Sequence, residues 1–142
     1  MSMAALKKNN SNWTTDSIPN LENKVALITG SNSGLGFCTA KALAEKGCHV
    51  ILACRTINKA NQAKTELGKL IPEAKLSTFE LDLSDFKKVA EKTNFIFEKF
   101  NSIDLLINNA GIMHPPKTLN AQGYEIQFAV NHLSHMLLTL KL

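Results

Sequence analysis

The sequence predicts an α/β fold in which helices cover both faces of a parallel sheet. From Lys24 onward, β-branched apolar runs alternate with stretches of helical periodicity, which is the pattern of consecutive βαβ units. The apolar runs are continuous, as expected for strands that are buried on both faces. The chain has 142 residues, of which 44% are hydrophobic and 20% charged, and this fits one globular domain.

The N-terminal segment, residues 1–20, is rich in Asn, Ser and Thr, and we expect it to form a polar, flexible arm. The domain then occupies residues 21–142 and begins with a strand at Lys24–Thr29. A helix is predicted from Gly34 to Lys46, because Gly47 is suited to the left-handed position that ends a helix.

The second predicted strand, His49–Arg55, leads into a helix over Asn58–Leu70 that Pro72 closes. The third strand is Leu76–Leu81, and the next helix runs to Phe100 with Ser84 as its N-cap. The apolar positions of that helix keep helical spacing and are assigned to the core: Phe86, Val89, Ala90, Thr93, Ile96, Phe97 and Phe100.

A fourth strand is predicted at Ile103–Asn108, followed by a loop and a helix from Gly123 to the C-terminus. Four strands in the order 3-2-1-4 make an incomplete Rossmann-type sheet with the fourth strand at an edge, so we expect the 142-residue chain to be marginally stable or self-associating. More than half the circumference of the last helix is apolar, which predicts a covering element or a second subunit, as in a homo-oligomer: Ile126, Ala129, Val130, Leu133, Met136, Leu137 and Leu140.

Composition and spacing exclude several classes of protein. The apolar runs are too short for a membrane span, and the lysines behind the net charge of +4 are too dispersed for a nucleic-acid surface. The histidines and cysteines have no zinc-ligand spacing, so no metal site is predicted. Three cysteines in apolar surroundings and no secretory signal favour a cytoplasmic protein with reduced core thiols, at Cys38, Cys48 and Cys54.

A glycine-rich turn joins the first strand to the first helix. It reads Thr29, Gly30, Ser31, Asn32, Ser33, Gly34, Leu35, Gly36. Gly30 suits a tight turn, Gly34 lets the backbone approach a pyrophosphate, and Gly36 lets the helix lie close to the sheet. Ser33 can cap the helix or contact a phosphate, and the helix N-terminus attracts an anion.

This spacing resembles the Thr-Gly-x-x-x-Gly-x-Gly turn of the short-chain dehydrogenase/reductase family, and three further segments match that family in order. The resemblance implies that Asp82 and Leu83 hold an adenine ring and that Asn109, Ala110 and Gly111 line the cofactor cleft. It also implies that Asn131 is the catalytic Asn that anchors a proton-relay water, although an Asn in a helix can be a satisfied core amide. Within this family, the sequences of these segments resemble the retinol dehydrogenase branch most.

The end of the second strand carries Arg55, where an acidic residue would instead bind the two ribose hydroxyls of NAD. A guanidinium suits a 2′-phosphate, and a charge-assisted hydrogen bond of about 1.5 to 3 kcal/mol corresponds to a tenfold to hundredfold preference for NADP. Lys59 adds a second positive charge one turn later. The alternative is that Arg55 is only a solvated side chain.

The family's Ser and Tyr-x-x-x-Lys lie downstream of its Asn helix, and this sequence does not contain them. The one tyrosine, Tyr124, precedes Asn131 and is followed four residues later by Phe128. The resemblance therefore implies an NADP(H)-dependent oxidoreductase acting on a small carbonyl or alcohol substrate, with this chain supplying a truncated, cofactor-binding half that is inactive alone. The alternatives are a nucleotide-binding or interaction protein without catalysis, and a fragment with no role.

Overall fold

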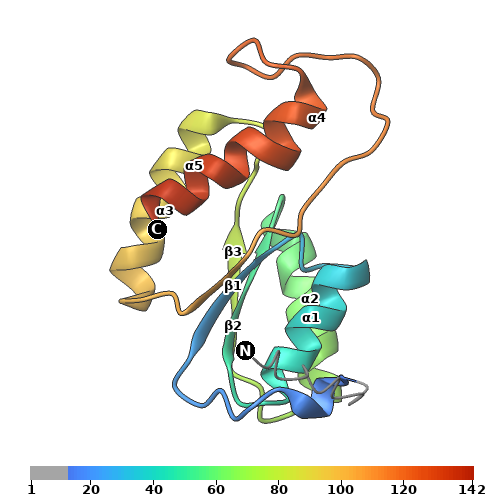
Figure 1. Cartoon of the computed structure of the whole chain (residues 1–142), viewed down its shortest axis with the longest axis vertical. Helices are drawn as coiled ribbons and strands as arrows, with labels where there is room; N and C mark the ends of the chain where they lie inside the picture. Colours follow the sequence, from blue (N-terminus) through green and yellow to red (C-terminus); the bar gives the residue numbers. More distant parts are fainter. Residues whose placement is uncertain (1–12) are drawn as a thin grey trace, which may run out of the picture.

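A four-stranded parallel sheet forms the centre of the computed structural model, which describes residues 13–142 (Figure 1). The strand order is β3-β2-β1-β4, as the sequence predicts. On β1, Ala26 pairs with Val50 of β2 on one side and with Leu105 of β4 on the other. The strands are β1 (Val25–Thr29), β2 (His49–Cys54), β3 (Leu76–Glu80) and β4 (Leu105–Ile107).

Helices cover both faces of this sheet. One face carries α1 (Gly34–Ala44) and α2 (Ile57–Leu70), and the other carries α3 (Phe86–Phe100) and α5 (Ser134–Lys141) (Figure 1). Successive strand residues point to opposite faces, so Ile28 packs towards α1 and α2 while Leu27 packs towards α3 and α5. Both side chains are fully buried, which explains why the strand sequences are continuously apolar.

The start of α3 differs from the prediction. Its N-cap is Asp85, whose carboxylate accepts the Lys87 N–H at 3.0 Å. Ser84 was predicted to be the cap, but its hydroxyl donates to Asp82 at 2.7 Å and is therefore engaged in the preceding turn. Of the predicted core positions on α3, Val89, Thr93 and Ile96 are buried, whereas Phe97 is 40% exposed and its assignment to the core was wrong.

The last helix begins later than predicted. Gly123 has φ +83, which is outside the helical region, and the helix starts after Glu125, which caps the N–H groups of Gln127 and Phe128. The helix consists of α4 (Ile126–Phe128), a π-helical turn η2 (Ala129–Leu133) and α5. Met136 and Leu140 are 52% and 74% exposed, and the predicted contact of this face with another subunit stays a prediction.

Three further observations concern the remaining sequence predictions. The arm is described only from residue 13, where a short 3-10 helix η1 (Thr15–Ser17) lies, so the prediction for residues 1–12 falls outside the described residues. Cys48 and Cys54 are buried as predicted, but Cys38 is exposed on α1, which corrects its assignment to the core. Over residues 13–142, no helix is long and apolar enough to cross a membrane.

Candidate functional site

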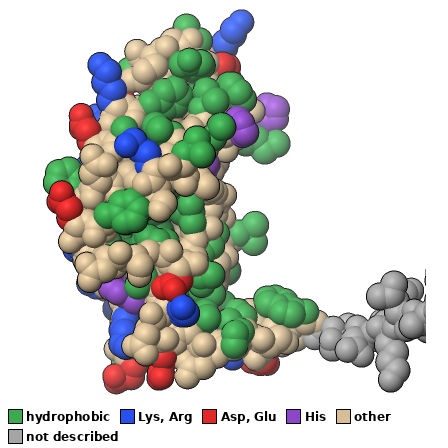
Figure 2. Space-filling view, turned by 60° about the vertical axis from the view of Figure 1, so that its left-hand side comes forward, with side chains coloured by type: hydrophobic (Ala, Val, Ile, Leu, Met, Phe, Trp, Pro, Cys, Tyr) green, Lys and Arg blue, Asp and Glu red, His purple; other side chains and the backbone are tan. Residues whose placement is uncertain are grey.

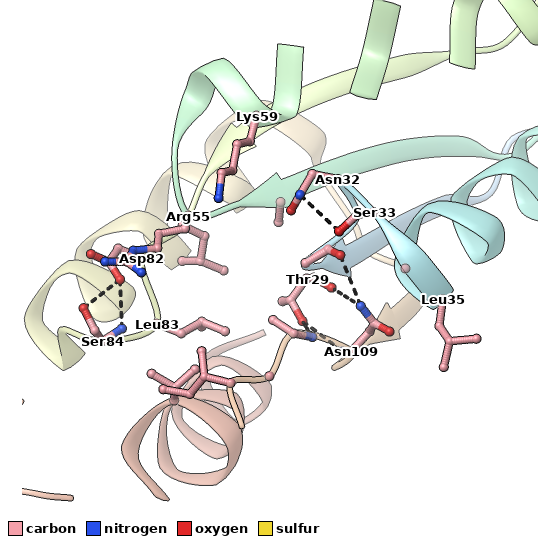
Figure 3. Close-up of a pocket in the computed structure, with 18 of the residues that line it drawn as sticks. Thr29, Asn32, Ser33, Leu35, Arg55, Lys59, Asp82, Leu83, Ser84 and Asn109 are labelled. Atoms are coloured by element: carbon pink, nitrogen blue, oxygen red, sulfur yellow. Dashed lines mark hydrogen bonds between the residues drawn. The ribbon is translucent and has the colours of Figure 1, made fainter. Parts of the chain in front are cut away.

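A cavity of about 600 Å³ lies at the carboxyl ends of the central strands (Figure 3). The chain order reverses between β1 and β4, and an open α/β sheet binds its ligands at such a point. The lining comes from the glycine-rich turn, the end of β2, the segment after β3 and the loop after β4: Thr29, Gly30, Asn32, Ser33, Leu35, Gly36, Ala53, Arg55, Lys59, Leu81, Asp82, Leu83, Ser84, Asn109, Ala110, Gly111, Ile112, Ile126 and Val130.

Two glycines of the turn have no room for a side chain. Gly30 has φ +65, and a Cβ there would lie 2.8 Å from the Cα of Ala110. A Cβ on Gly36 would collide with the side-chain amide of Asn109 and with the carbonyl oxygen of Gly30. These contacts place α1 and the loop after β4 close to the turn.

Gly34 differs from the other two. Its φ is +56, but a Cβ there would meet no protein atom within 4 Å. The backbone at the start of α1 is therefore open on that side, which suits the close approach of a phosphate to the helix N-terminus. Ser33 occupies the N-cap position, yet its side chain makes no capping hydrogen bond, so the predicted capping role of the hydroxyl was wrong.

The hydroxyl of Thr29 joins the turn to the loop after β4. Thr29 is 1% exposed, and its Oγ1 accepts the backbone N–H groups of Asn109 and Ala110, each at 2.9 Å. In return, the Asn109 side-chain amide donates to the carbonyl oxygens of Thr29 at 2.9 Å and Gly30 at 3.3 Å. These bonds fix two walls of the cavity against each other.

The segment after β3 forms another wall. Asp82 Oδ1 accepts the N–H of Ser84 at 3.0 Å and its hydroxyl at 2.7 Å, which fixes the turn around Leu83. The buried hydroxyl of Ser134, at the start of α5, donates to the carbonyl oxygen of Leu83 at 2.6 Å. The segment that the family resemblance assigns to the adenine ring is therefore tied to α5.

Positive charge gathers at one end of the cavity. Arg55 and Lys59 line it there, and Figure 3 shows Leu35 and Asn109 at the opposite end. Asp82 is the acidic side chain among the described lining residues, and it does not stand at the end of β2. Beneath this end, the buried Cys54 thiol lies 3.6 Å from the hydroxyl of Ser31, and burial raises the pKa of that thiol.

Asn131 lies in the middle of the π-helical turn, where the N–H of Ser134 donates five residues back to Ala129. Its exposed side chain is engaged on both sides with the backbone of Ile112: Oδ1 accepts the Ile112 N–H and Nδ2 donates to the Ile112 carbonyl, each at 2.9 Å. Asn131 is therefore not a core amide. It holds the loop after β4 at the point where that loop lines the cavity.

The structure brings most of the predicted site residues into this single cavity. Three are not part of its lining: Ser31 is buried against Cys54, Gly34 lies on the exposed turn, and Asn131 stands behind Ile112. The binding roles of these residues stay predictions, because their positions alone do not test them.

Two residues that connect the cavity to α5 were not predicted to do so. From the sequence, neither Ser134 nor His135 is assigned a role in the site. His135 is 6% exposed, and its ring bonds both to Thr29 and to the carbonyl oxygen of Asn131. Its spacing of four residues from Asn131 is a weak signal, which any helical pair would share.

Comparison with known proteins decides the family. A profile described as short chain dehydrogenase matches residues 24–142. The chain belongs to the short-chain dehydrogenase family. It is 41% identical over 131 residues to an uncharacterized oxidoreductase of Schizosaccharomyces pombe, a match that covers 92% of this chain and 39% of that protein. It is 40% identical over 119 residues to retinol dehydrogenase 11 of Mus musculus, covering 84% of this chain and 38% of that protein.

Two solved structures have the same fold. An uncharacterized protein from Mycobacterium paratuberculosis superposes with a TM-score of 0.80 at 38% identity, covering 92% of this chain and 45% of that one. A short chain dehydrogenase from Shigella flexneri 2a, solved in complex with NADP, gives a TM-score of 0.72 at 24% identity, covering 87% and 53%. This short-chain dehydrogenase spans less than half the length of the curated relatives described above.

The residues of the cavity fit the nicotinamide dinucleotide that the family binds. The turn keeps two positions clear of side chains and leaves the backbone at Gly34 open, as close contact with a pyrophosphate requires. The volume of about 600 Å³ lies within the range of small-molecule and cofactor sites. The charged groups of the cavity come from three segments: Arg55 follows β2, Lys59 lies in α2 and Asp82 follows β3, at the same end of the cavity as Arg55 in Figure 3.

Proposed function

We propose that this protein is an NADP(H)-dependent oxidoreductase that interconverts an alcohol and a carbonyl compound, and that residues 24–142 supply its cofactor-binding half. One observation carries the choice of cofactor: Arg55 and Lys59 line the same cavity as the glycine-rich turn, at the position where an NAD-binding protein would present a carboxylate. Two cations at that position favour the additional 2′-phosphate of NADP.

Each group of residues has a distinct task in this proposal. The open backbone at Gly34 and the N-terminus of α1 receive the pyrophosphate, and Arg55 and Lys59 hold the 2′-phosphate. Asp82 and Leu83 contact the adenine ring, and Asn109, Ala110 and Gly111 form the wall beside the rest of the cofactor. When bound, the nicotinamide supplies or accepts the hydride.

Asn131 has a proposed role behind Ile112, which lines the cavity. Its amide is fixed by two hydrogen bonds to Ile112, so the loop after β4 and the π-helical turn keep a constant separation. A polar group fixed in this way can orient a water that carries a proton to or from the substrate. The substrate itself is proposed to be lipophilic, by analogy with relatives named as retinol dehydrogenases.

A second candidate is a nucleotide-binding or interaction protein that performs no chemistry of its own. Tyr124 is followed four residues later by Phe128, so this tyrosine does not form a Tyr-x-x-x-Lys pair. Both candidates share the cofactor site. They differ in whether the protein isolated from its source oxidises NADPH in the presence of carbonyl compounds.

Binding of NADPH to the purified chain, measured by calorimetry, tests the shared site. Gly30→Ala places a Cβ 2.8 Å from Ala110 at a positive φ, and we expect it to weaken NADPH binding at least tenfold. Gly68→Ala is the matched control, since Gly68 lies in α2 and a Cβ there meets nothing within 4 Å. Undiminished affinity in Gly30→Ala, with the fold intact, would remove the turn from the site.

A further inference from the structure

The buried imidazole of His135 lies between the glycine-rich turn and the Asn131 segment. Its Nε2 is 2.9 Å from the hydroxyl of Thr29, and its Nδ1 is 3.1 Å from the main-chain carbonyl oxygen of Asn131. Thr29 and His135 are 106 positions apart in the chain. The ring therefore makes a direct polar link between β1 and α5 at the inner edge of the cavity.

Hydrogen-bond accounting at Thr29 selects one tautomer of this ring. A hydroxyl has one proton and two lone pairs. Thr29 Oγ1 accepts the N–H groups of Asn109 and Ala110, and the Asn109 N–H also lies 3.0 Å from the carbonyl oxygen of Ile107. The hydroxyl proton must go to an acceptor, and Nε2 at 2.9 Å is closer than the carbonyl oxygen of Ile107 at 3.4 Å.

Nε2 is thus the unprotonated nitrogen, and the proton of the neutral ring sits on Nδ1. From there it donates to the Asn131 carbonyl, which is a normal acceptor. This arrangement satisfies every donor and acceptor in the chain of contacts. The opposite tautomer would place the unprotonated Nδ1 against the carbonyl oxygen of Asn131, so that two lone pairs would face each other at 3.1 Å.

We propose that His135 is a positioning residue which, in its neutral form with the proton on Nδ1, orients the Thr29 hydroxyl and fixes the Asn131 segment for cofactor binding, and that its protonation releases this link. The proposal rests on the proposed function, because it assumes that NADPH binds in the cavity. In the protonated ring Nε2 carries a hydrogen and can no longer accept the hydrogen bond from the Thr29 hydroxyl. To accept this new N–H instead, the hydroxyl would have to give up one of the two loop N–H groups that it now accepts.

The surroundings favour the neutral ring. Burial lowers the pKa of His135, although the hydrogen bond to the Asn131 carbonyl acts in the opposite direction. The helices around the ring carry further charged residues, none of which is a cause of the shift: Lys87, Lys88, Glu91, Lys92, Glu98 and Lys99 on α3 and Lys141 on α5. Arg55, Lys59 and Asp82 line the cavity and are not causes either. On its own helix, His132 is exposed and stacks on Phe128.

The test begins with the tautomer. Nitrogen-15 NMR of the 142-residue chain, labelled at histidine, should show His135 protonated on Nδ1 alone at pH 7.5. Its titration should lie below the ordinary histidine value of about 6.5. A proton on Nε2 would overturn the proposal, because Thr29 could then not donate to the ring.

Three variants at His135 separate the two contacts. His135→Gln can keep an acceptor near Thr29 but cannot titrate, His135→Asn keeps only a donor towards the Asn131 carbonyl, and His135→Leu keeps neither. His132→Gln is the matched control on the exposed side of the same helix. At pH 7.5 we expect NADPH affinity to fall about tenfold in His135→Leu and less than threefold in His135→Gln, while His132→Gln equals the wild type.

The pH profile distinguishes positioning from simple packing. Between pH 7.5 and 5.5, wild-type affinity should fall several-fold more than that of His135→Gln. The difference should stay below about tenfold, because a ring with a pKa below about 6.5 is only partly protonated at pH 5.5. The comparison is needed because a phosphate monoester such as the 2′-phosphate itself gains a proton near pH 6. Parallel profiles in the two proteins would overturn the proposal, even if His135→Leu fails to fold.

The two proposals fail in different ways. Absence of NADPH binding by the wild type at pH 7.5 overturns the proposed function and, with it, the role of His135 in cofactor binding. Normal wild-type binding together with an Nε2 proton, or with parallel pH profiles, overturns only the role of His135.

Discussion

Replacing Arg55 tests the choice between NADP and NAD. The Arg55 side chain is exposed at the end of β2 and lines the cavity together with Lys59. A charge-assisted hydrogen bond contributes about 1.5 to 3 kcal/mol, and solvent screening of an exposed guanidinium places the value near the lower end. Loss of about 1.5 kcal/mol lowers the preference for NADP about tenfold, and this is the expected effect of Arg55→Ala.

Arg55→Asp should have a larger effect, because the new carboxylate repels the 2′-phosphate and can accept hydrogen bonds from the ribose hydroxyls of NAD. We expect the ratio of the two dissociation constants, measured by calorimetry, to shift by a factor of tenfold to hundredfold towards NAD. Lys64→Asp makes the same change of charge on α2 outside the cavity lining and is the control. An unchanged ratio in Arg55→Asp, or an equal shift in Lys64→Asp, would refute the assignment of the 2′-phosphate.

Two further predictions concern Ser134, which bonds to a cavity wall, and Asp104, which precedes β4 at the other end of the sheet. Ser134→Ala leaves the carbonyl oxygen of Leu83 without its 2.6 Å donor, and we expect it to lower the free energy of unfolding by about 1 to 3 kcal/mol in chemical denaturation, whereas the exposed Ser102→Ala should have no measurable effect. The hydrogen bonds from Lys24 and the Val25 N–H lower the pKa of Asp104. This carboxylate therefore stabilises the fold above its unfolded pKa of about 4 and loses the contribution as the pH falls, so Asp104→Asn should flatten the acid limb of the unfolding profile; an unaltered limb would contradict the assignment.

The fold could be predicted because its determinants are local and repeated. Strands buried on both faces must be apolar throughout. On the side that carries α3 and α5, Figure 2 shows hydrophobic side chains that the described residues bury only in part. The helix starts were predicted less well, because capping depends on competing partners. Ser84 has the right chemistry for an N-cap, but its hydroxyl donates to Asp82 instead.

The glycines of the site could be predicted for a related reason. A positive φ, or a neighbour that leaves no room for a Cβ, constrains a single position and favours glycine there. Gly30 and Gly36 are two such positions, because a Cβ would meet Ala110 at the first and Asn109 at the second. The charge of Arg55 is equally local. Only its distance from the turn depends on the folded chain, and the order of the strands determines that distance.

His135 and Ser134 could not be predicted, because their partners are set by tertiary contacts across the whole domain. A polar pair within an apolar helix is compatible with exposure, with a back-bond to the helix, or with a buried partner elsewhere, and the sequence does not distinguish these. The structure decides it: Ser134 bonds to Leu83 and His135 bonds to Thr29, so adjacent residues of α5 reach two different walls of the cavity. A shift of α5 would therefore displace both walls together. Ser134 and His135 are polar because they bond to the walls of the cavity, and not because the helix itself requires polar residues at these positions.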